Sequence, residues 1–186
     1  MRLLHIMDSD DYENCTRLAV RNSARAIIVS DGMVALIHSR SRNYYKLPGG
    51  GIEKGESKED SLIRETLEET GLQVIPETIS ELGYIHRIKR SRKYEDECFI
   101  QNNYYYFCEV RDGVSEPRYD EGELSEDFIP EFVDPRLALE VNSRIGENDP
   151  LYEMVSRENF ILELLIEAMD MNEGERSAGT DAHAKL

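Results

Sequence analysis

The sequence predicts an α/β domain in which helices pack on a β-sheet. Three observations favour this class: apolar and β-branched runs separated by turn signals, one well-capped helix between such runs, and an amphipathic helix near the end of the chain. The 186 residues are 40% hydrophobic, which is enough for one core and thin for two. We therefore expect one domain over residues 1–171, with residues 1–22 as an N-terminal extension or edge strand.

The first strands are expected as a hairpin. Residues 25–30 are apolar and β-branched, Asp31-Gly32 is a two-residue turn signal, and residues 33–39 are apolar again. A polar stretch then leads into Leu47-Pro48-Gly49-Gly50-Gly51, whose glycines permit close approaches that other residues forbid. This glycine loop indicates that another group comes near its backbone.

A helix is predicted over residues 58–70. Ser57 and Asp60 form a capping-box pattern at its start, and Gly71 is typical of a helix C-terminus. A helical wheel at about 100° per residue gives a core-facing side with Leu62, Ile63, Thr66, Leu67 and Thr70. Another stripe, expected to be exposed, carries Glu65, Glu68 and Glu69. These carboxylates can converge on one cation, although an acidic face in contact with water would show the same pattern.

Further strands are expected over residues 83–88, 99–110 and 128–133, with a loop over residues 111–127. Strand alternation places Tyr105 on one face of the sheet and Tyr104 and Tyr106 on the other. Two Asp-Pro pairs, at Asp134 and Asp149, each predict a helix start. The last helix has apolar residues at spacings of three, four and seven, so one face packs on the core.

The end of the chain, residues 172–186, contains no Val, Ile, Phe or Tyr. Its Gly, Ser, Glu and Ala content offers little to bury against the entropy of ordering. We expect these residues to form a disordered and dispensable tail.

Charge restricts the partners of the protein. The chain has 38 acidic and 22 basic residues, a net charge of -16, so it repels nucleic acid and anionic lipid, and an anionic substrate requires a metal or a local basic patch. Apolar runs stay far below the roughly 20 residues of a membrane span, and the start lacks the pattern of a secretory signal. Three cysteines without CxxC spacing fit a reducing compartment. We expect a cytoplasmic protein without membrane or nucleic-acid partners, and a homodimer is left open.

The chemistry is concentrated between Gly50 and Leu72. A glycine is followed by a glutamate, by an Arg-Glu pair, by two adjacent glutamates and by a second glycine, and these residues are Gly50, Glu56, Arg64, Glu65, Glu68, Glu69 and Gly71. This pattern resembles the signature of the Nudix hydrolase family, with Thr66 where the family has an aliphatic residue. The resemblance implies an α/β/α sandwich with a mixed β-sheet.

The resemblance also implies roles for these residues. Glu65 and Glu69 are the main expected Mg²⁺ ligands, Glu68 is a further ligand, and the Gly50 carbonyl is another oxygen donor; Mn²⁺ is the alternative ion. Arg64 is expected to pair with Glu56 or Glu68, and Gly71 to end the helix. Catalytic roles are assigned to Glu65 and Glu69. Two residues are rival candidates for the base that takes a proton from water: Glu65, in the predicted helix, and Glu123, in the acidic loop over residues 111–127.

The implied reaction is hydrolysis of the pyrophosphate bond of a nucleoside diphosphate derivative by attack of water on phosphorus. The substrate is a small-molecule nucleotide, and a nucleoside triphosphate and a nucleotide-sugar both remain open because the known subgroup markers are absent. Candidate substrate contacts are Arg40, Arg42, Tyr45 and Lys46. Two alternatives are a catalytically silent domain that senses a nucleotide and, with weaker support, a prenyl diphosphate isomerase.

One basic stretch stands out in this acidic chain. Residues 87–93 contain five cations, which either contact substrate phosphates or form an exposed hairpin balanced by the acidic residues 95–97.

Overall fold

Six strands of the described chain form the larger β-sheet. The computed structural model describes residues 1–119 and 121–181, with residues 121, 123 and 173–181 described by their backbone alone. The strands are β1 (Leu3–Asp8), β2 (Arg17–Val20), β3 (Ser23–Ile27), β7 (Gly49–Gly51), β9 (Ser80–Arg90) and β10 (Glu97–Phe107). They lie in the order β1-β9-β10-β3-β7, and β2 also pairs with β10. The sheet is mixed, because β9 and β10 are antiparallel whereas β1 runs parallel to β9 and β3 runs parallel to β10.

Another sheet is antiparallel and contains β4 (Val29–Ser30), β5 (Met33–Ser39), β6 (Tyr44–Lys46) and β12 (Phe128–Val133). The predicted turn joins β4 to β5: Asp31 and Gly32 have φ values of 50° and 77°, as a two-residue hairpin turn requires. A short ribbon pairs β8 (Leu72–Val74) with β11 (Val110–Val114).

The prediction of a loop over residues 111–127 is wrong in two places. β11 covers the start of this segment, and the short helix α2 (Glu121–Ser125) lies near its end. β11 forms because β8 offers it a partner strand, which local composition does not reveal.

The first 22 residues contribute two strands to the larger sheet. β1 runs parallel to β9, with Leu3 opposite Tyr84 and Asp8 opposite Ile88, and it forms an edge of the sheet. β2 runs parallel to the first half of β10. Both strands therefore depend on partners that lie about 80 positions later in the chain.

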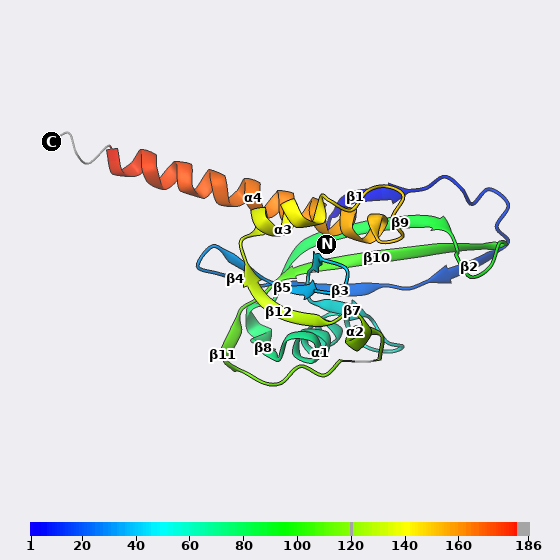
Figure 1. Cartoon of the computed structure of the whole chain (residues 1–186), viewed down its shortest axis with the longest axis horizontal. Helices are drawn as coiled ribbons and strands as arrows, with labels where there is room; N and C mark the ends of the chain where they lie inside the picture. The colour runs from blue at the N-terminus through cyan, green and yellow to red at the C-terminus, as the bar shows by residue number, and fades with distance from the viewer. Residues whose placement is uncertain (120, 182–186) are drawn as a thin grey trace.

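Helices lie on both sides of the sheets (Figure 1). α1 (Lys58–Thr70) lies on one side, and α3 (Pro135–Asn142) and α4 (Tyr152–Asp181) lie on the other; a 3-10 helix, η1, covers Pro76–Thr78. The predicted α/β/α sandwich is confirmed. α1 has the predicted ends: the Ser57 hydroxyl accepts a hydrogen bond from the Asp60 N–H at 3.0 Å, and Gly71 is left-handed with φ 73°.

The core has an apolar cluster on each side of the larger sheet. Tyr105 packs in the cluster that includes Ile161 and Leu162 of α4, whereas Tyr106 packs in the cluster that includes Leu62 of α1. The predicted alternation of the tyrosines is thus confirmed. Leu67, which was expected to face the core, is 37% exposed; it lies at the margin of the apolar side of α1, beyond the reach of the sheet.

α4 extends farther than predicted. Its backbone is helical as far as Asp181, and the expected disorder of residues 172–186 stays a prediction. This segment contains no proline, the residue that most strongly ends a helix. Residues 182–186 lie outside the described part of the chain, and the dispensability of the tail stays a prediction.

Candidate active site

The glycine loop and helix α1 meet at Gly50 and Glu65. Gly50 lies in β7, which pairs with β3 and is thereby fixed beside α1. A Cβ atom on Gly50 would lie 2.2 Å from Oε2 and 2.5 Å from Oε1 of Glu65. The Glu65 carboxylate therefore occupies the space that any other residue at position 50 would need. Burial raises the pKa of this carboxyl group, and the neighbouring Arg64 partly counteracts that rise.

Arg64 connects the carboxylates of the motif. Its Nε and Nη2 donate to the two oxygens of Glu56 at 2.8 and 2.9 Å, a bidentate pair. Nη1 donates to Glu65 Oε1 at 2.8 Å and to Glu68 Oε2 at 3.2 Å, and Nη2 also reaches the Gly51 carbonyl at 3.1 Å. The hydrogen bonds from Arg64 lower the pKa of Glu56 to about 2. Arg64 therefore contacts both of the partners expected for it, Glu56 and Glu68.

Of the three glutamates predicted to form an exposed stripe, Glu65 is only 16% exposed and Glu69 is more deeply buried. Its side chain is 3% exposed, against 43% for Glu68. Oε2 accepts a hydrogen bond from the Gly49 N–H at 2.7 Å, and Oε1 lies 2.6 Å from Nζ of Lys46. The helical wheel missed this because it distinguishes core from solvent only, whereas the strand and loop over residues 46–49 cover this flank of α1.

The donor atoms suit a divalent cation in part. No cluster of three or more His, Cys, Asp or Glu side chains forms a ready metal site in the described residues. One atom, Arg64 Nη1, nevertheless donates to both Glu65 and Glu68, so the guanidinium group holds these two carboxylates near each other, with Glu65 beside Gly50. Carboxylate and carbonyl oxygens are the ligands that Mg²⁺ prefers.

A comparison with known families decides the classification. The sequence profile described as NUDIX domain matches residues 20–151. The chain belongs to the Nudix family. This match covers β3, the glycine loop, α1 and the strands through β12, which are the elements that build the site.

Individual relatives agree with this classification. The chain is 43% identical over 49 residues to the Uncharacterized Nudix hydrolase YvcI of Bacillus subtilis, a match covering 26% of this chain and 31% of that protein. It is 30% identical over 64 residues to an RNA pyrophosphohydrolase of Azorhizobium caulinodans, covering 34% and 38%. The matches thus span about a third of these curated relatives. A solved NUDIX hydrolase from Nitrosomonas europaea shares the fold, with a TM-score of 0.51, 18% identity and coverage of 75% of this chain and 88% of that one.

The candidate substrate contacts of this Nudix domain are dispersed. Lys46 joins the motif through Glu69 and also lies 4.3 Å from the ring centre of Phe128. Arg40 lies near Asp127 and Arg42 near Asp149, both at the surface. Tyr45 is a core residue, so its ring is covered and unsuited to stack on a base. The structure therefore brings only Lys46 of these four to the Nudix motif among the described residues.

Gly71 does more than end the Nudix helix. A Cβ atom there would lie 1.8 Å from the carbonyl oxygen of Ser115. The Ser115 N–H donates to the Gly71 carbonyl at 3.0 Å, and the Arg118 N–H donates to the Glu68 carbonyl at 2.7 Å. These bonds attach residues 115–118, in the segment 111–127, to the end of α1. The side chain of Glu123, the candidate base in that segment, lies outside the described residues, and its role stays a prediction.

Sequence reasoning missed a buried ionic group that holds the glycine loop. Glu158 of α4 accepts a hydrogen bond from the Leu47 N–H at 2.9 Å, and Arg25 of β3 donates to the Leu47 and Gly49 carbonyls at 2.8 and 3.0 Å. Burial opposes ionisation of Glu158, but Arg25 and Arg157 lower its pKa below the usual range. A signal was available: Glu158 occupies a helical position three residues from both Val155 and Ile161, on the buried face of α4.

Proposed function

We propose that this Nudix protein is a Mg²⁺-dependent pyrophosphohydrolase that cleaves the pyrophosphate bond of a nucleoside diphosphate derivative. The observation that carries the proposal is that Arg64 holds the carboxylates of Glu65 and Glu68 near each other, with Glu65 against Gly50. In an acidic chain, such a site lets cations lie between the protein and an anionic substrate. The name of the Azorhizobium relative, an RNA pyrophosphohydrolase, supports cleavage of a phosphoric anhydride.

In this proposal the metal ligands are Glu65, Glu68 and the Gly50 carbonyl. Glu69 remains a fourth proposed ligand, and its contact with Lys46 must open if it binds the ion. A bound divalent cation supplies positive charge to phosphate oxygens and makes water a stronger acid. The ion pair with Glu56 fixes the guanidinium group of Arg64, which in turn positions the carboxylates of Glu65 and Glu68.

The proton of the attacking water requires an acceptor. Glu65 suits this role because burial raises its pKa and makes it a stronger base than a solvated carboxylate. Glu123 remains the rival candidate. Substitution of each by Gln separates the two roles: loss of a base lowers kcat and keeps the Mg²⁺ requirement, whereas loss of a ligand changes both.

The decisive experiment is a hydrolysis assay on a panel of substrates. The panel contains nucleoside triphosphates, nucleotide-sugars, dinucleoside polyphosphates and a 5′-triphosphorylated RNA, each with Mg²⁺ or Mn²⁺ and with a coupled pyrophosphatase or phosphatase. We expect hydrolysis of at least one substrate, abolished by EDTA and lowered at least about 10²-fold by Glu65→Gln or Glu68→Gln. The matched control is Glu140→Gln, because Glu140 lies exposed on α3 and pairs with Arg144.

Other outcomes support the alternatives. Nucleotide binding without turnover on the whole panel would favour a sensing domain, and isomerisation of a prenyl diphosphate would favour the isomerase. The choice between a triphosphate and a nucleotide-sugar, the use of Mn²⁺, the homodimer and the cytoplasmic location stay predictions. No helix within the described residues is both long and apolar enough to cross a membrane.

A further inference from the structure

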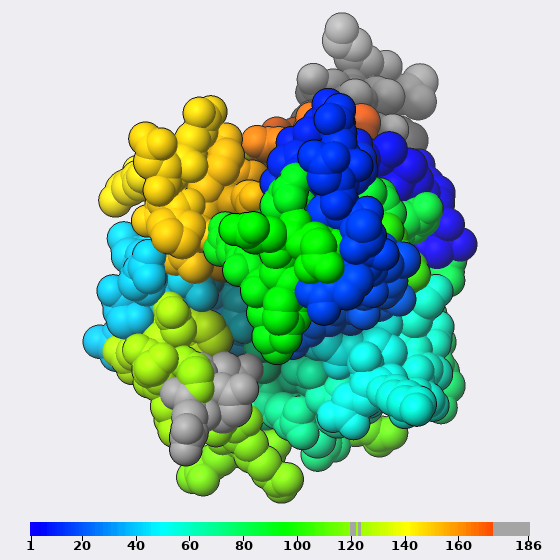
Figure 2. Space-filling view, turned by 90° about the vertical axis from the view of Figure 1, so that its right-hand side faces the viewer, coloured from blue at the N-terminus to red at the C-terminus, as the bar shows by residue number. Residues whose placement is uncertain are grey.

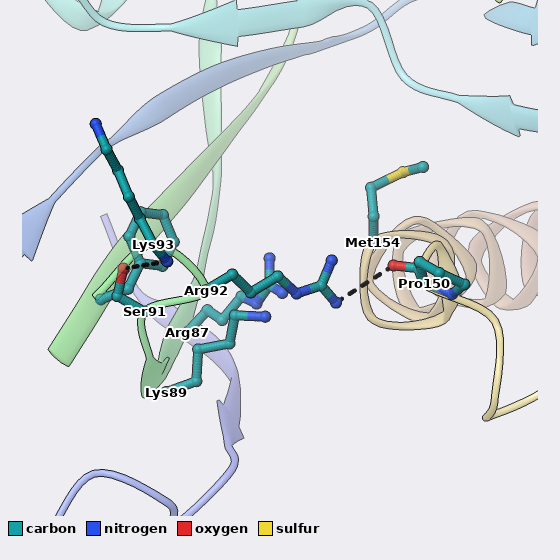
Figure 3. A pocket seen from close by; sticks show the side chains of 8 residues that line it. Arg87, Lys89, Ser91, Arg92, Lys93, Pro150 and Met154 are labelled. Carbon is teal, nitrogen blue, oxygen red and sulfur yellow. Dashed lines mark hydrogen bonds between the residues drawn. The ribbon is translucent and has the colours of Figure 1, made fainter. Parts of the chain in front are cut away.

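A basic pocket of about 330 Å³ lies where the ends of β9 and β10 meet the start of α4. Figure 3 shows the side chains around it. Three cations of this pocket, Arg87, Lys89 and Arg92, point toward the start of α4, whereas Lys93 points away. The remaining lining residues are Ser91, Phe99, Pro150 and Met154.

The cations of the basic pocket share one internal carboxylate. Glu153, in the first turn of α4, is contacted by Arg87 and Lys89, and Arg92 Nη2 lies 3.6 Å from its Oε2. Arg92 also donates to the Pro150 carbonyl at 3.4 Å. Three positive charges thus surround one negative charge, which leaves an excess of two in a chain whose net charge is -16.

The acidic residues that follow in sequence do not compensate this excess. Asp96 pairs with Arg17 at 2.8 Å, and the carbonyl of Glu95 accepts a hydrogen bond from Arg90. The expected balance between the two halves of the stretch is therefore wrong for Arg87, Lys89 and Arg92. Their side chains turn toward α4, which a reading of the sequence as a local hairpin could not anticipate.

The excess positive charge lies on side chains that are largely removed from water, where a charge is unfavourable. The side chains of Arg87 and Lys89 are 14% and 9% exposed, and burial lowers the pKa of both. The buried Arg157 adds to the repulsion felt by Arg87. Charged groups removed from water require oppositely charged partners with good hydrogen bonds. A bound anion would meet this requirement.

Helix α4 connects the basic pocket to the glycine loop. Glu153 in the pocket and Glu158, which binds the Leu47 N–H beside the glycine loop, belong to the same helix. Figure 2 shows a hollow in the surface between the gold start of α4, the green turn of β9 and β10, and the lime segment before β12.

We propose that the basic pocket binds a phosphoryl group carrying about two negative charges, and that the Glu153 carboxylate takes its place when no ligand is bound. The charge of such a group equals the excess at the pocket, and guanidinium and ammonium groups are the donors that bind phosphate. Phe99 and Met154 provide an apolar wall for an organic group attached to the phosphate. The group belongs either to the substrate or to a free phosphate; only the first source depends on the proposed hydrolysis.

Binding is tested with inorganic phosphate and metal-free full-length protein in EDTA, by calorimetric titration at constant ionic strength with chloride as the reference anion. We expect saturable binding that weakens about tenfold or more in Lys89→Met and in Arg92→Ala, since each removes one charged hydrogen bond. Glu153→Gln should bind phosphate more tightly than the wild type, because the internal competitor is removed. Arg144→Ala is the control and should bind like the wild type, because Arg144 follows α3, is exposed and pairs with Glu140.

A second measurement covers the case in which Glu153→Gln is unstable. Phosphate should then raise the melting temperature of this variant more than that of the wild type, because it replaces the lost counter-charge. The proposal is overturned if phosphate does not bind the wild type more tightly than chloride does, or if Lys89→Met binds it unchanged.

The two sources of the phosphate give different kinetics. If the group is part of the substrate, Lys89→Met raises KM for nucleotides that carry a phosphate in addition to the cleaved pyrophosphate. KM for nucleotides without this additional phosphate stays unchanged. If the group is free phosphate, its addition changes the rate with both kinds of substrate, and Lys89→Met removes this effect. If no nucleotide is hydrolysed, the proposed function fails while the titration with phosphate still decides the pocket.

Discussion

At the residue scale, Gly50 determines where the Glu65 carboxylate lies. In Gly50→Ala the new methyl group would overlap the carboxylate, whose nearest atom lies 2.2 Å from the Cβ position. Because a flexible side chain can move aside, we expect a folded protein with a displaced carboxylate and hydrolysis lowered about 10²-fold. The rate and the melting temperature are measured together. Gly146→Ala is the control, since a Cβ there meets nothing within 4 Å.

Glu69 is predicted to support stability as well as activity. Glu69→Gln keeps an acceptor for the Gly49 N–H and removes the charge that faces Lys46. A buried ammonium group without its carboxylate should cost about 1–3 kcal/mol of unfolding free energy, measured by urea denaturation. Glu68→Gln is the control, expected within about 0.5 kcal/mol because its side chain is 43% exposed, against 3% for Glu69. Equal stability of the two variants would contradict the observed ion pair.

Glu56 makes stability depend on pH. Its pKa is about 2 in the folded protein, against 4.5 for an ordinary glutamate. The unfolded chain therefore takes up a proton first as pH falls, so the stabilisation is complete above the ordinary pKa and is lost as pH decreases toward 2. We expect Glu56→Gln to be less stable than the wild type at pH 7 and the difference to shrink between pH 5 and pH 2. A difference in melting temperature between the wild type and Glu56→Gln that stays constant from pH 7 to pH 2 would refute this.

At the scale of elements, Gly71 couples the end of α1 to the segment at Ser115. In Gly71→Ala a Cβ atom would lie 1.8 Å from a backbone oxygen, which cannot rotate away as a side chain can. We expect a loss greater than about 1 kcal/mol and faster hydrogen exchange at the Ser115 and Arg118 amides. Gly32→Ala is the matched control: its φ is 77°, near the 73° of Gly71, and no atom lies within 4 Å of its Cβ position. Similar losses in both variants would mean that φ strain alone is responsible.

Elements differ in how far their sequence predicts them. α1 was predicted to its ends because Ser57 and Gly71 act on neighbouring backbone groups, and the β4–β5 turn follows from Asp31 and Gly32 for the same reason. β11 was missed because its strand character depends on β8, about 40 positions away.

In the candidate site, too, contacts within one helix could be predicted from the sequence and contacts between distant segments could not. The spacing of the motif predicted the contact of Arg64 with Glu56 and Glu68, since all three lie on or beside one helix. It could not predict the burial of Glu69, which depends on how the glycine loop crosses α1. The basic pocket depends on Glu153, more than 60 positions after Lys89 and on another element.

At the scale of the whole molecule, α4 projects beyond the sheets toward the chain end (Figure 1). Among the side chains that the structure describes in α4, Met169 is the last one packed against the core cluster, and Met171 is 66% exposed. We expect removal of residues 172–186 to cost less than about 1 kcal/mol, a shift of at most about 2–4 °C in melting temperature. A calorimetric scan checks this, and a fall of 10 °C or more, the value of several kcal/mol at this size, would show that the tail contributes to the folded core.

The parallel pairing of β1 with β9 also sets an order of events during synthesis. Leu3 pairs opposite Tyr84, so the ribosome must add about 80 residues, taking about 4–16 s at about 5–20 residues per second, before β1 meets its partner. During this interval Leu3, Leu4 and Ile6 belong to an unpaired strand on the nascent chain. β2 waits for β10 in the same way. The beginning of this protein is therefore among the last parts of the sheet to assemble, and it is the part most dependent on protection from other chains while translation continues.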